Sequence, residues 1–164
     1  MRSTMTVVLT LGVLLSGALG AAAAPVQTPQ VLDHLQWTGT SWFGSPIVHD
    51  LGTGKRKLIG TYYDIFVWDF DEQQGKFNLL DTAPSGAEYP HEGRIYAPAV
   101  CADLDDDGIY EVVVGSNNGK VAAYEWKNNQ LSVKAGWPAS ACDAGQCPEV
   151  RGLAAGDLNR DGKI

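Results

Sequence analysis

The chain has 164 residues, with 12 basic and 19 acidic side chains and a formal charge of −7. This acidity repels phosphate backbones and argues against nucleic acid as a partner. Three cysteines are too few for a disulfide-stabilised scaffold, and 19 glycines and eight prolines between short apolar runs favour β-structure with frequent turns.

The first 24 residues have the pattern of a secretory signal peptide. Arg2 provides a basic start, residues 6–19 are largely apolar, and residues 20–24 are small, as signal peptidase requires. The apolar run is shorter than the roughly 20 residues that a membrane-spanning helix needs. We therefore expect residues 1–24 to be cleaved and the protein to be secreted and extracellular, or cell-surface if an anchor follows. No other segment is expected to span a membrane.

Residues 25–44 are expected to form a linker or lead-in strand, and an internal repeat follows them. Residues 45–51 match residues 97–104 with one insertion, residues 65–70 match 121–126, and residues 75–79 match 129–133. A third copy opens at Arg151. The spacing is 53 residues from Asp50 to Asp103 and 54 from Asp103 to Asp157. Such a repeat has room for four strands and their turns.

The second copy predicts four strands, at residues 98–104, 111–115, 120–126 and 130–135. Asn118 and Gly119 form the expected turn before the third strand, because both tolerate positive φ. Residues 136–138 are expected to form the turn that leaves the unit. Four-stranded repeats of this length predict an all-β protein built from β-propeller blades. A two-sheet sandwich would not be expected to repeat the pattern at a fixed spacing.

The predicted organisation is therefore blade 1 at residues 45–96, blade 2 at 97–150 and the start of blade 3 at 151–164. A propeller needs at least about four blades to close. We therefore expect an incomplete ring, from the N-terminal part of a longer protein. Cys142 and Cys147 are favoured to form a small disulfide loop, and Cys101 is expected to be a buried thiol.

Five carboxylates lie within nine residues of blade 2, between residues 103 and 111, and no basic residue lies between Arg94 and Lys120. Like charges this close repel one another, and a divalent cation removes the repulsion. Calcium accepts six to eight oxygen ligands in flexible geometry. The loop is therefore expected to bind calcium.

The spacing assigns the ligands. Side chains at positions one, three, five and nine of the loop can converge, the backbone carbonyl at position seven can join them, and Gly108 permits the sharp turn. Asp106 should point outward. The predicted ligands are Asp103, Asp105, Asp107, Ile109 (through its carbonyl) and Glu111.

Three other interpretations of this loop are weaker. A solvated acidic turn would not combine the alternation, the glycine and the ninth-position acid. Magnesium is disfavoured because a shell made mostly of protein oxygens is too large and irregular for it. An EF-hand needs a glutamate at position twelve and flanking helices, whereas Val114 stands there within a β-branched run.

The other two copies are less complete. The third keeps side-chain oxygens at positions one, three and five, contributed by Asp157, Asn159 and Asp161, and it predicts a truncated site. The first has glycine at Gly52 and Gly54 and is followed by basic residues, so it is expected to be a degenerate turn without a cation. Residues 157–164 also look like the start of a dockerin calcium loop. The match of residues 153–155 to 100–102 favours a third blade instead.

These residues resemble the FG-GAP/VCBS repeat proteins, whose blades look like those of the integrin α-subunit propeller. The resemblance covers residues 45–164 and rests on residues 102–108 with 111–115, and on residues 156–162. It implies that loop positions one, three, five, seven and nine ligate calcium, in agreement with the spacing. Clear Phe-Gly and Gly-Ala-Pro signatures are absent, which favours the broader repeat over a true integrin chain.

The predicted function is a secreted calcium-binding module that binds an extracellular protein or glycan, as in adhesion. The alternative is the propeller domain of a secreted polysaccharide-degrading enzyme whose catalytic residues lie beyond Ile164. A purely structural scaffold is a third hypothesis. The sequence contains no recognisable nucleophile–base set, so no catalytic residue is assigned and the question of enzymatic activity stays open.

Overall fold

The computed structural model describes Asp33, Leu35 and residues 45–83 and 93–164, all within the unit Val31–Ile164. The expected signal peptide and nearly all of residues 25–44 lie outside the described residues. The described residues form nine strands and no helix, so none of them forms a helix that could cross a membrane. The prediction of an all-β protein is confirmed.

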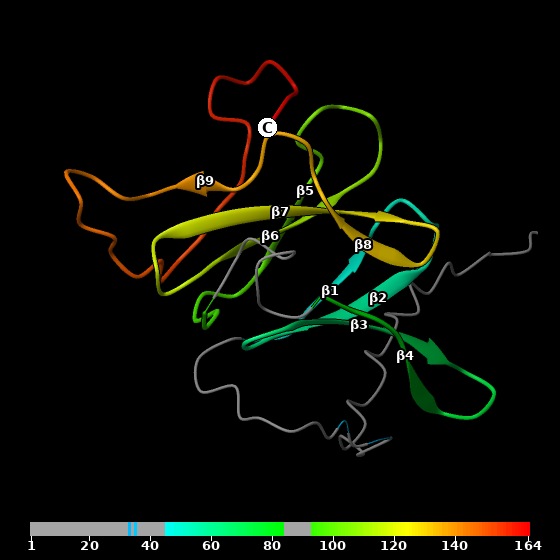
Figure 1. Cartoon of the computed structure of the whole chain (residues 1–164). Helices are drawn as coiled ribbons and strands as arrows, with labels where there is room; N and C mark the ends of the chain where they lie inside the picture. Colours follow the sequence, from blue (N-terminus) through cyan, green and yellow to red (C-terminus); the bar gives the residue numbers. More distant parts are fainter. Residues whose placement is uncertain (1–32, 34, 36–44, 84–92) are drawn as a thin grey trace, which may run out of the picture. The chain divides into compact units, whose positions relative to one another are not determined.

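Blade 1 is a four-stranded antiparallel sheet (Figure 1). Its strands lie in the order of the chain, so each strand pairs with the next one. This meander is the arrangement expected for a propeller blade. The strands are β1 (Ile47–Asp50), β2 (Arg56–Thr61), β3 (Ile65–Asp71) and β4 (Lys76–Ala83).

Blade 2 repeats this meander, as its sequence predicts. The second strand has the expected bounds, and the third extends one residue further than expected. The β-branched and aromatic residues of these two strands suit a pleated, buried surface. The strands are β5 (Val100–Ala102), β6 (Glu111–Gly115), β7 (Lys120–Lys127) and β8 (Gln130–Val133).

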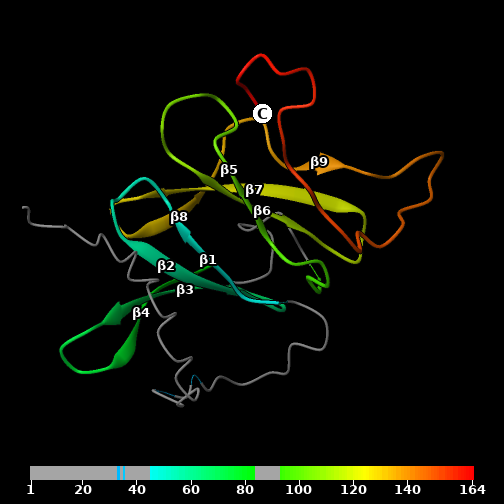
Figure 2. The ribbon, with the colours of Figure 1, turned by 180° about the vertical axis from the view of Figure 1, so that it is seen from behind.

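The end of blade 2 differs from the prediction. Residues 136–138 do not lead out of the sheet, because the chain returns to β7 as a short strand, β9 (Ala139–Ser140) (Figure 2). β7 has eight residues and β8 only four, so β8 leaves part of the β7 edge unpaired. β9 pairs with that part, at Lys120 and Val121.

The cysteines follow the sequence-based expectation. Cys142 and Cys147 form a disulfide that closes the loop after β9. Cys101 is a free, half-buried thiol in β5, and its burial raises its pKa to about 12. A thiol with this pKa stays protonated and unreactive at neutral pH.

One hydrophobic core joins the two sheets. Blade 1 contributes Ile59 and Val67, which lie opposite each other on β2 and β3, and blade 2 contributes Val112 and Tyr124, which pair across β6 and β7. All four are fully buried. The two blades therefore stabilise each other by sharing apolar surface.

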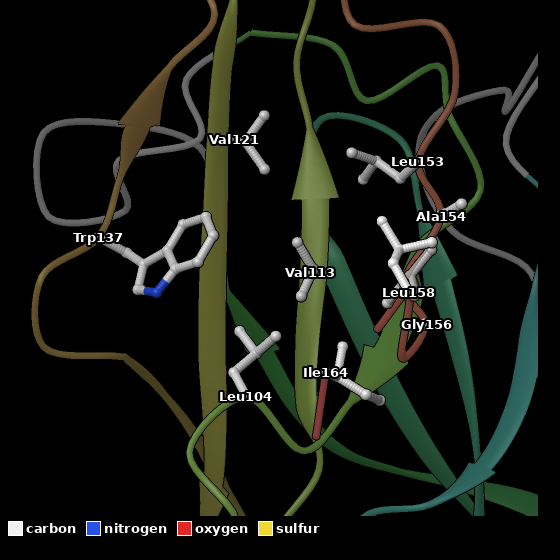
Figure 3. A pocket seen from close by; sticks show the side chains of 11 residues that line it. Leu104, Val113, Val121, Trp137, Leu153, Ala154, Gly156, Leu158 and Ile164 are labelled. Atoms are coloured by element: carbon white, nitrogen blue, oxygen red, sulfur yellow. The ribbon is translucent and has the colours of Figure 1, made fainter. Parts of the chain in front are cut away.

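The register also identifies the next packing surface. Val113 and Ala123 of blade 2 pair in the same way as Ile59 and Val67 of blade 1. Val113 lines a largely apolar hollow, with Leu153, Leu158 and Ile164 of the following segment beside it (Figure 3). We interpret this hollow as the blade 2 copy of a blade-packing surface rather than as a ligand pocket.

The turn of blade 1 touches the acidic loop of blade 2 at a glycine. Gly52 has φ = +86°, and a Cβ there would lie 3.1 Å from the Gly108 carbonyl oxygen and 3.3 Å from Cα of Ile109. Gly54 has a similar φ of +75°, but its Cβ would meet nothing within 4 Å. Substituting either glycine therefore strains the backbone, but only a side chain at Gly52 would also collide with the acidic loop.

We expect Gly52→Ala to destabilise the chain more than Gly54→Ala. Each substitution costs about 1–2 kcal/mol of stability, because an L-residue is placed in the left-handed region. Only the Cβ of Gly52→Ala also lies too close to Gly108 and Ile109 of the acidic loop. Urea unfolding monitored by circular dichroism measures the difference. Equal losses of stability would mean that the two loops do not pack closely.

Candidate metal centre

The acidic loop lies at one end of blade 2, where β5 and β6 meet. These strands pair antiparallel with Ala102 opposite Glu111. The register therefore brings together the two ends of the loop, Asp103 and Glu111, which are eight positions apart in the sequence. Residues 103–110 form the connection between the strands, as predicted.

Three of the predicted ligands converge. Asp103, Asp105 and Glu111 each offer a carboxylate oxygen, and these oxygens lie within 4.8 Å of one another. Asp103 is half-buried, Asp105 is exposed, and Glu111 is fully buried. Three oxygens at this spacing can hold a metal ion, because calcium–oxygen distances of about 2.3–2.6 Å place neighbouring ligands within 5 Å.

Backbone hydrogen bonds shape the loop around Asp103. Its Oδ1 accepts from the N–H of Asp107 at 3.1 Å, and its Oδ2 accepts from the N–H of Gly108 at 2.9 Å. Asp106 and Gly108 adopt positive φ, at 60° and 82°. Gly108 therefore makes the sharp turn that its sequence position predicts.

Of the other two predicted ligands, Asp107 does not belong to the group of three converging carboxylates. Asp107 is exposed, and its Oδ1 accepts from the N–H of Ile109 at 2.8 Å. Ile109 is half-buried next to the turn of blade 1. A cation at the cluster therefore has three carboxylates close together, with Asp107 and Ile109 nearby on the same loop.

Glu111 is the most enclosed acid of the site. Its side chain has an exposed fraction of 0%. Oε2 accepts from the N–H of Leu104 at 2.8 Å, and Oε1 accepts from the Lys134 ammonium at 3.0 Å. A buried carboxylate requires such partners, because an unpaired one would carry a large desolvation cost.

Lys134 is the residue that sequence reasoning missed. It follows β8, and its Nζ donates to Asp105 Oδ2 at 2.7 Å, to Glu111 Oε1 at 3.0 Å and to Glu125 Oε1 at 3.3 Å. Period-two alternation offers the only signal for it. Lys134 lies opposite Ala123, which places it on the same face as Glu125.

These ion pairs shift the titration of the groups. The hydrogen bond from Lys134 lowers the pKa of Asp105, and a hydrogen bond from Lys127 is the main cause of the lowered pKa of Glu125. Burial alone would lower the pKa of Lys134, but its bonds to Asp105 and Glu111 outweigh that effect and raise it. All these groups are therefore charged at neutral pH.

The third copy of the loop is built like the second. Asp157 Oδ2 accepts from the N–H of Gly162 at 2.7 Å, and Asp161 Oδ1 accepts from the N–H of Lys163 at 2.9 Å. Both bonds are the blade 2 bonds moved by 54 positions. Asn159 instead donates to Asp161 Oδ2 at 2.8 Å.

The side chains of the third copy are exposed, and one contact joins it to the second. Lys163 forms an ion pair with Asp106 and thereby acquires a raised pKa. Asp106 therefore faces the neighbouring loop and not the carboxylate cluster, in line with the outward position expected for it.

The first copy uses its remaining acid to shape the turn. Asp50 Oδ1 accepts from the N–H groups of Thr53 and Gly54, at 2.9 and 3.1 Å. Positions three and five of this loop carry no side-chain oxygen, because they are glycines. The turn therefore offers a single carboxylate, as expected for a degenerate copy.

Comparisons with known proteins agree with the repeat. Residues 103–164 match the family model of the FG-GAP-like repeat. No curated protein and no solved structure matches the chain significantly. The matched segment begins at the first acid of the blade 2 loop and includes the third copy. Residues 103–164 therefore form a segment that is similar to the FG-GAP-like repeat, in agreement with the resemblance expected from the sequence.

Proposed function

We propose that the blade 2 loop binds calcium and that the protein is a secreted binding module. The observation that carries the metal proposal is the convergence of Asp103, Asp105 and Glu111 within 4.8 Å. Asp107 and the carbonyl of Ile109 would complete the oxygen set. A bound calcium ion would supply positive charge and hold the loop in one conformation.

The charge balance supports a divalent ion. Asp103, Asp105, Glu111 and Glu125 bring four negative charges to the cluster, and Lys134 together with Lys127, which pairs with Glu125, brings two positive charges. Two negative charges therefore remain uncompensated. Calcium, with its preference for carboxylate oxygens, suits the remainder.

The surroundings of the loop support a structural role for the ion. The loop contacts blade 1 through Gly52, and the rings of His49 and Tyr110 lie 4.6 Å apart across the same junction. A cation that fixes the loop would therefore also fix this contact between blades. The third loop is proposed to bind calcium in the same way, through Asp157, Asn159 and Asp161.

The ends of the strands away from the loop support a binding role. Arg94 donates to the hydroxyl groups of Tyr63 and Tyr96, and the Arg151 guanidinium lies 4.7 Å from the centre of the Tyr96 ring. Tyrosine and arginine are enriched at binding hot spots. We therefore propose recognition of an extracellular protein or glycan at this surface.

The alternative is the propeller domain of a secreted polysaccharide-degrading enzyme. Because the catalytic residues of that enzyme would lie beyond Ile164, affinity electrophoresis of the full-length protein through gels containing neutral or uronate-rich polysaccharides separates the two. Retarded migration without new reducing ends favours glycan binding, and release of reducing ends favours the enzyme. Migration unaffected by every gel leaves protein as the proposed ligand.

Asp105→Asn is expected to weaken calcium-dependent stabilisation. Calcium at a hundredfold excess over its dissociation constant stabilises the native protein by about 2.7 kcal/mol, and a tenfold weaker site at the same concentration gives about 1.4 kcal/mol. Thermal unfolding with calcium and with chelator measures the shift.

The matched control is Thr53→Asn, in the turn of blade 1 where no cation is expected. This variant should keep the full calcium shift. Equal effects of the two substitutions would contradict the expectation that the blade 2 loop binds calcium and the blade 1 turn does not. The absence of any calcium shift in the unmodified chain would refute the calcium proposal.

A further inference from the structure

We propose that Lys134 is a tethered counter-ion of the acidic loop, which calcium must displace from Asp105 and Glu111, and that this competition sets the calcium affinity. The inference rests on the proposed calcium site. It concerns a residue outside the loop, 29 positions beyond Asp105.

The first support is the geometry of the ammonium. Lys134 Nζ lies 2.7 Å from Asp105 Oδ2 and 3.0 Å from Glu111 Oε1. These two carboxylates belong to the group of three that converges within 4.8 Å. A divalent ion that uses these oxygens therefore competes directly with the lysine for them.

The second support is the enclosure of the pair. The Lys134 side chain has an exposed fraction of 9%, and that of Glu111 is 0%. A lysine is rarely this buried without charge partners, because its ammonium loses hydration. Its three carboxylate contacts compensate for that loss, so Lys134 offsets part of the negative charge of the acidic loop.

The third support is the arrangement of charges across the strands. Val112 pairs with Tyr124, and continuing this register by one residue places Glu111 opposite Glu125. Two like charges facing each other across strands are destabilising. Lys134 contacts both, at 3.0 and 3.3 Å, and removes this repulsion.

In blade 1, the residues equivalent to Glu111 and Glu125 carry opposite charges instead of two negative ones. The register equates Lys57 with Glu111 and Asp69 with Glu125, and Lys57 Nζ lies 3.2 Å from Asp69. This blade has opposite charges across the strands and no acids at loop positions three and five. The residue of β4 opposite Val67 is Asp81, whereas Lys134 lies opposite Ala123, the blade 2 counterpart of Val67, so blade 1 has no lysine at this place.

The comparison of the blades explains why a lysine follows the fourth strand of blade 2. Of these two blades, only the one with the acidic loop needs an additional cation. When calcium occupies the loop, Lys134 loses Asp105 and Glu111 and keeps Glu125, which is only partly buried. Calcium binding should therefore expose the lysine.

The test is calorimetric titration of calcium into the full chain and into two variants. Lys134→Met keeps the unbranched apolar part of the side chain and removes the ammonium that competes with calcium. We expect this variant to bind calcium at least tenfold more tightly, and to be less stable than the unmodified chain when calcium is absent.

Lys127→Met is the matched control. Lys127 pairs with Glu125 and is exposed, so this variant removes a positive charge from the same hairpin without touching Asp105 or Glu111. It should tighten calcium binding less than threefold. If both variants change the affinity equally, the lysine acts only through net charge and the inference fails. If none of the three proteins binds calcium, the proposed function itself fails.

A measurement on the unmodified chain covers the case in which Lys134→Met does not fold. Acetylation of lysines, followed by mass spectrometry, is compared with calcium and with chelator. Lys134 should react at least fivefold faster with calcium, whereas Lys57, which is similarly buried but pairs with Asp69 of blade 1 instead of with a loop acid, should not change. Calcium binding without a change at Lys134 would overturn the inference.

Discussion

Replacing Glu111 by glutamine is expected to lower the free energy of unfolding of the calcium-free protein by about 3 kcal/mol. The carboxylate is fully buried and compensates the ammonium of Lys134. Removing one partner of a buried ion pair leaves the other charge without compensation, which costs about 3–5 kcal/mol. The lower end applies because Lys134 retains Asp105 and Glu125.

Urea unfolding of Glu111→Gln and of Asp107→Asn measures this effect. Asp107 is exposed and accepts one backbone hydrogen bond from Ile109, so its replacement should change stability by less than about 1 kcal/mol. Glu111→Gln should also abolish most of the calcium-dependent stabilisation. A Glu111→Gln protein as stable as the unmodified chain would show that the buried ion pair contributes nothing to folding.

Ile59→Ala is expected to cost about 3 kcal/mol, the second large effect. Ile59 is fully buried in the core that joins the two sheets. Truncating a buried isoleucine to alanine removes apolar contacts and leaves a cavity, at a cost of about 2–5 kcal/mol. Because both blades share this core, the loss should appear as one cooperative shift of the whole unfolding transition.

Leu79→Ala is the control for Ile59→Ala. Leu79 lies on β4 of the same blade, and its exposed fraction is 54%. Its truncation should change the free energy of unfolding by less than about 1 kcal/mol. A small effect at both positions would contradict the packing of blade 1 on blade 2.

The strands of blade 2 could be predicted from sequence because their signals are local. β6 is a β-branched run with the predicted bounds, and β7 differs from its prediction by one residue. The repeat also predicted that the second sheet copies the first. Hydrophobic alternation and repeat spacing both reside in short stretches of chain, so the sequence displays them directly.

The turns depend on more than local sequence. Asn118 and Gly119 form the predicted turn between β6 and β7, and of these two residues only Gly119 has a positive φ, at 77°. Asn128 and Asn129, between β7 and β8, both have positive φ, at 54° and 60°. Asparagine tolerates both conformations, so the register of the neighbouring strands decides which one a turn adopts.

The sequence by itself determined the all-β repeat, the acidic loop and the glycine that shapes it, because these depend on residues within about ten positions of one another. Only the tertiary structure decided which acids converge, and that Lys134 lies among them. Glu111 and Lys134 are 23 positions apart, and their contact depends on the register of three strands. The acidic loop has no basic residue within its own sequence, yet in the folded protein the ammonium of Lys134 contacts two of its carboxylates.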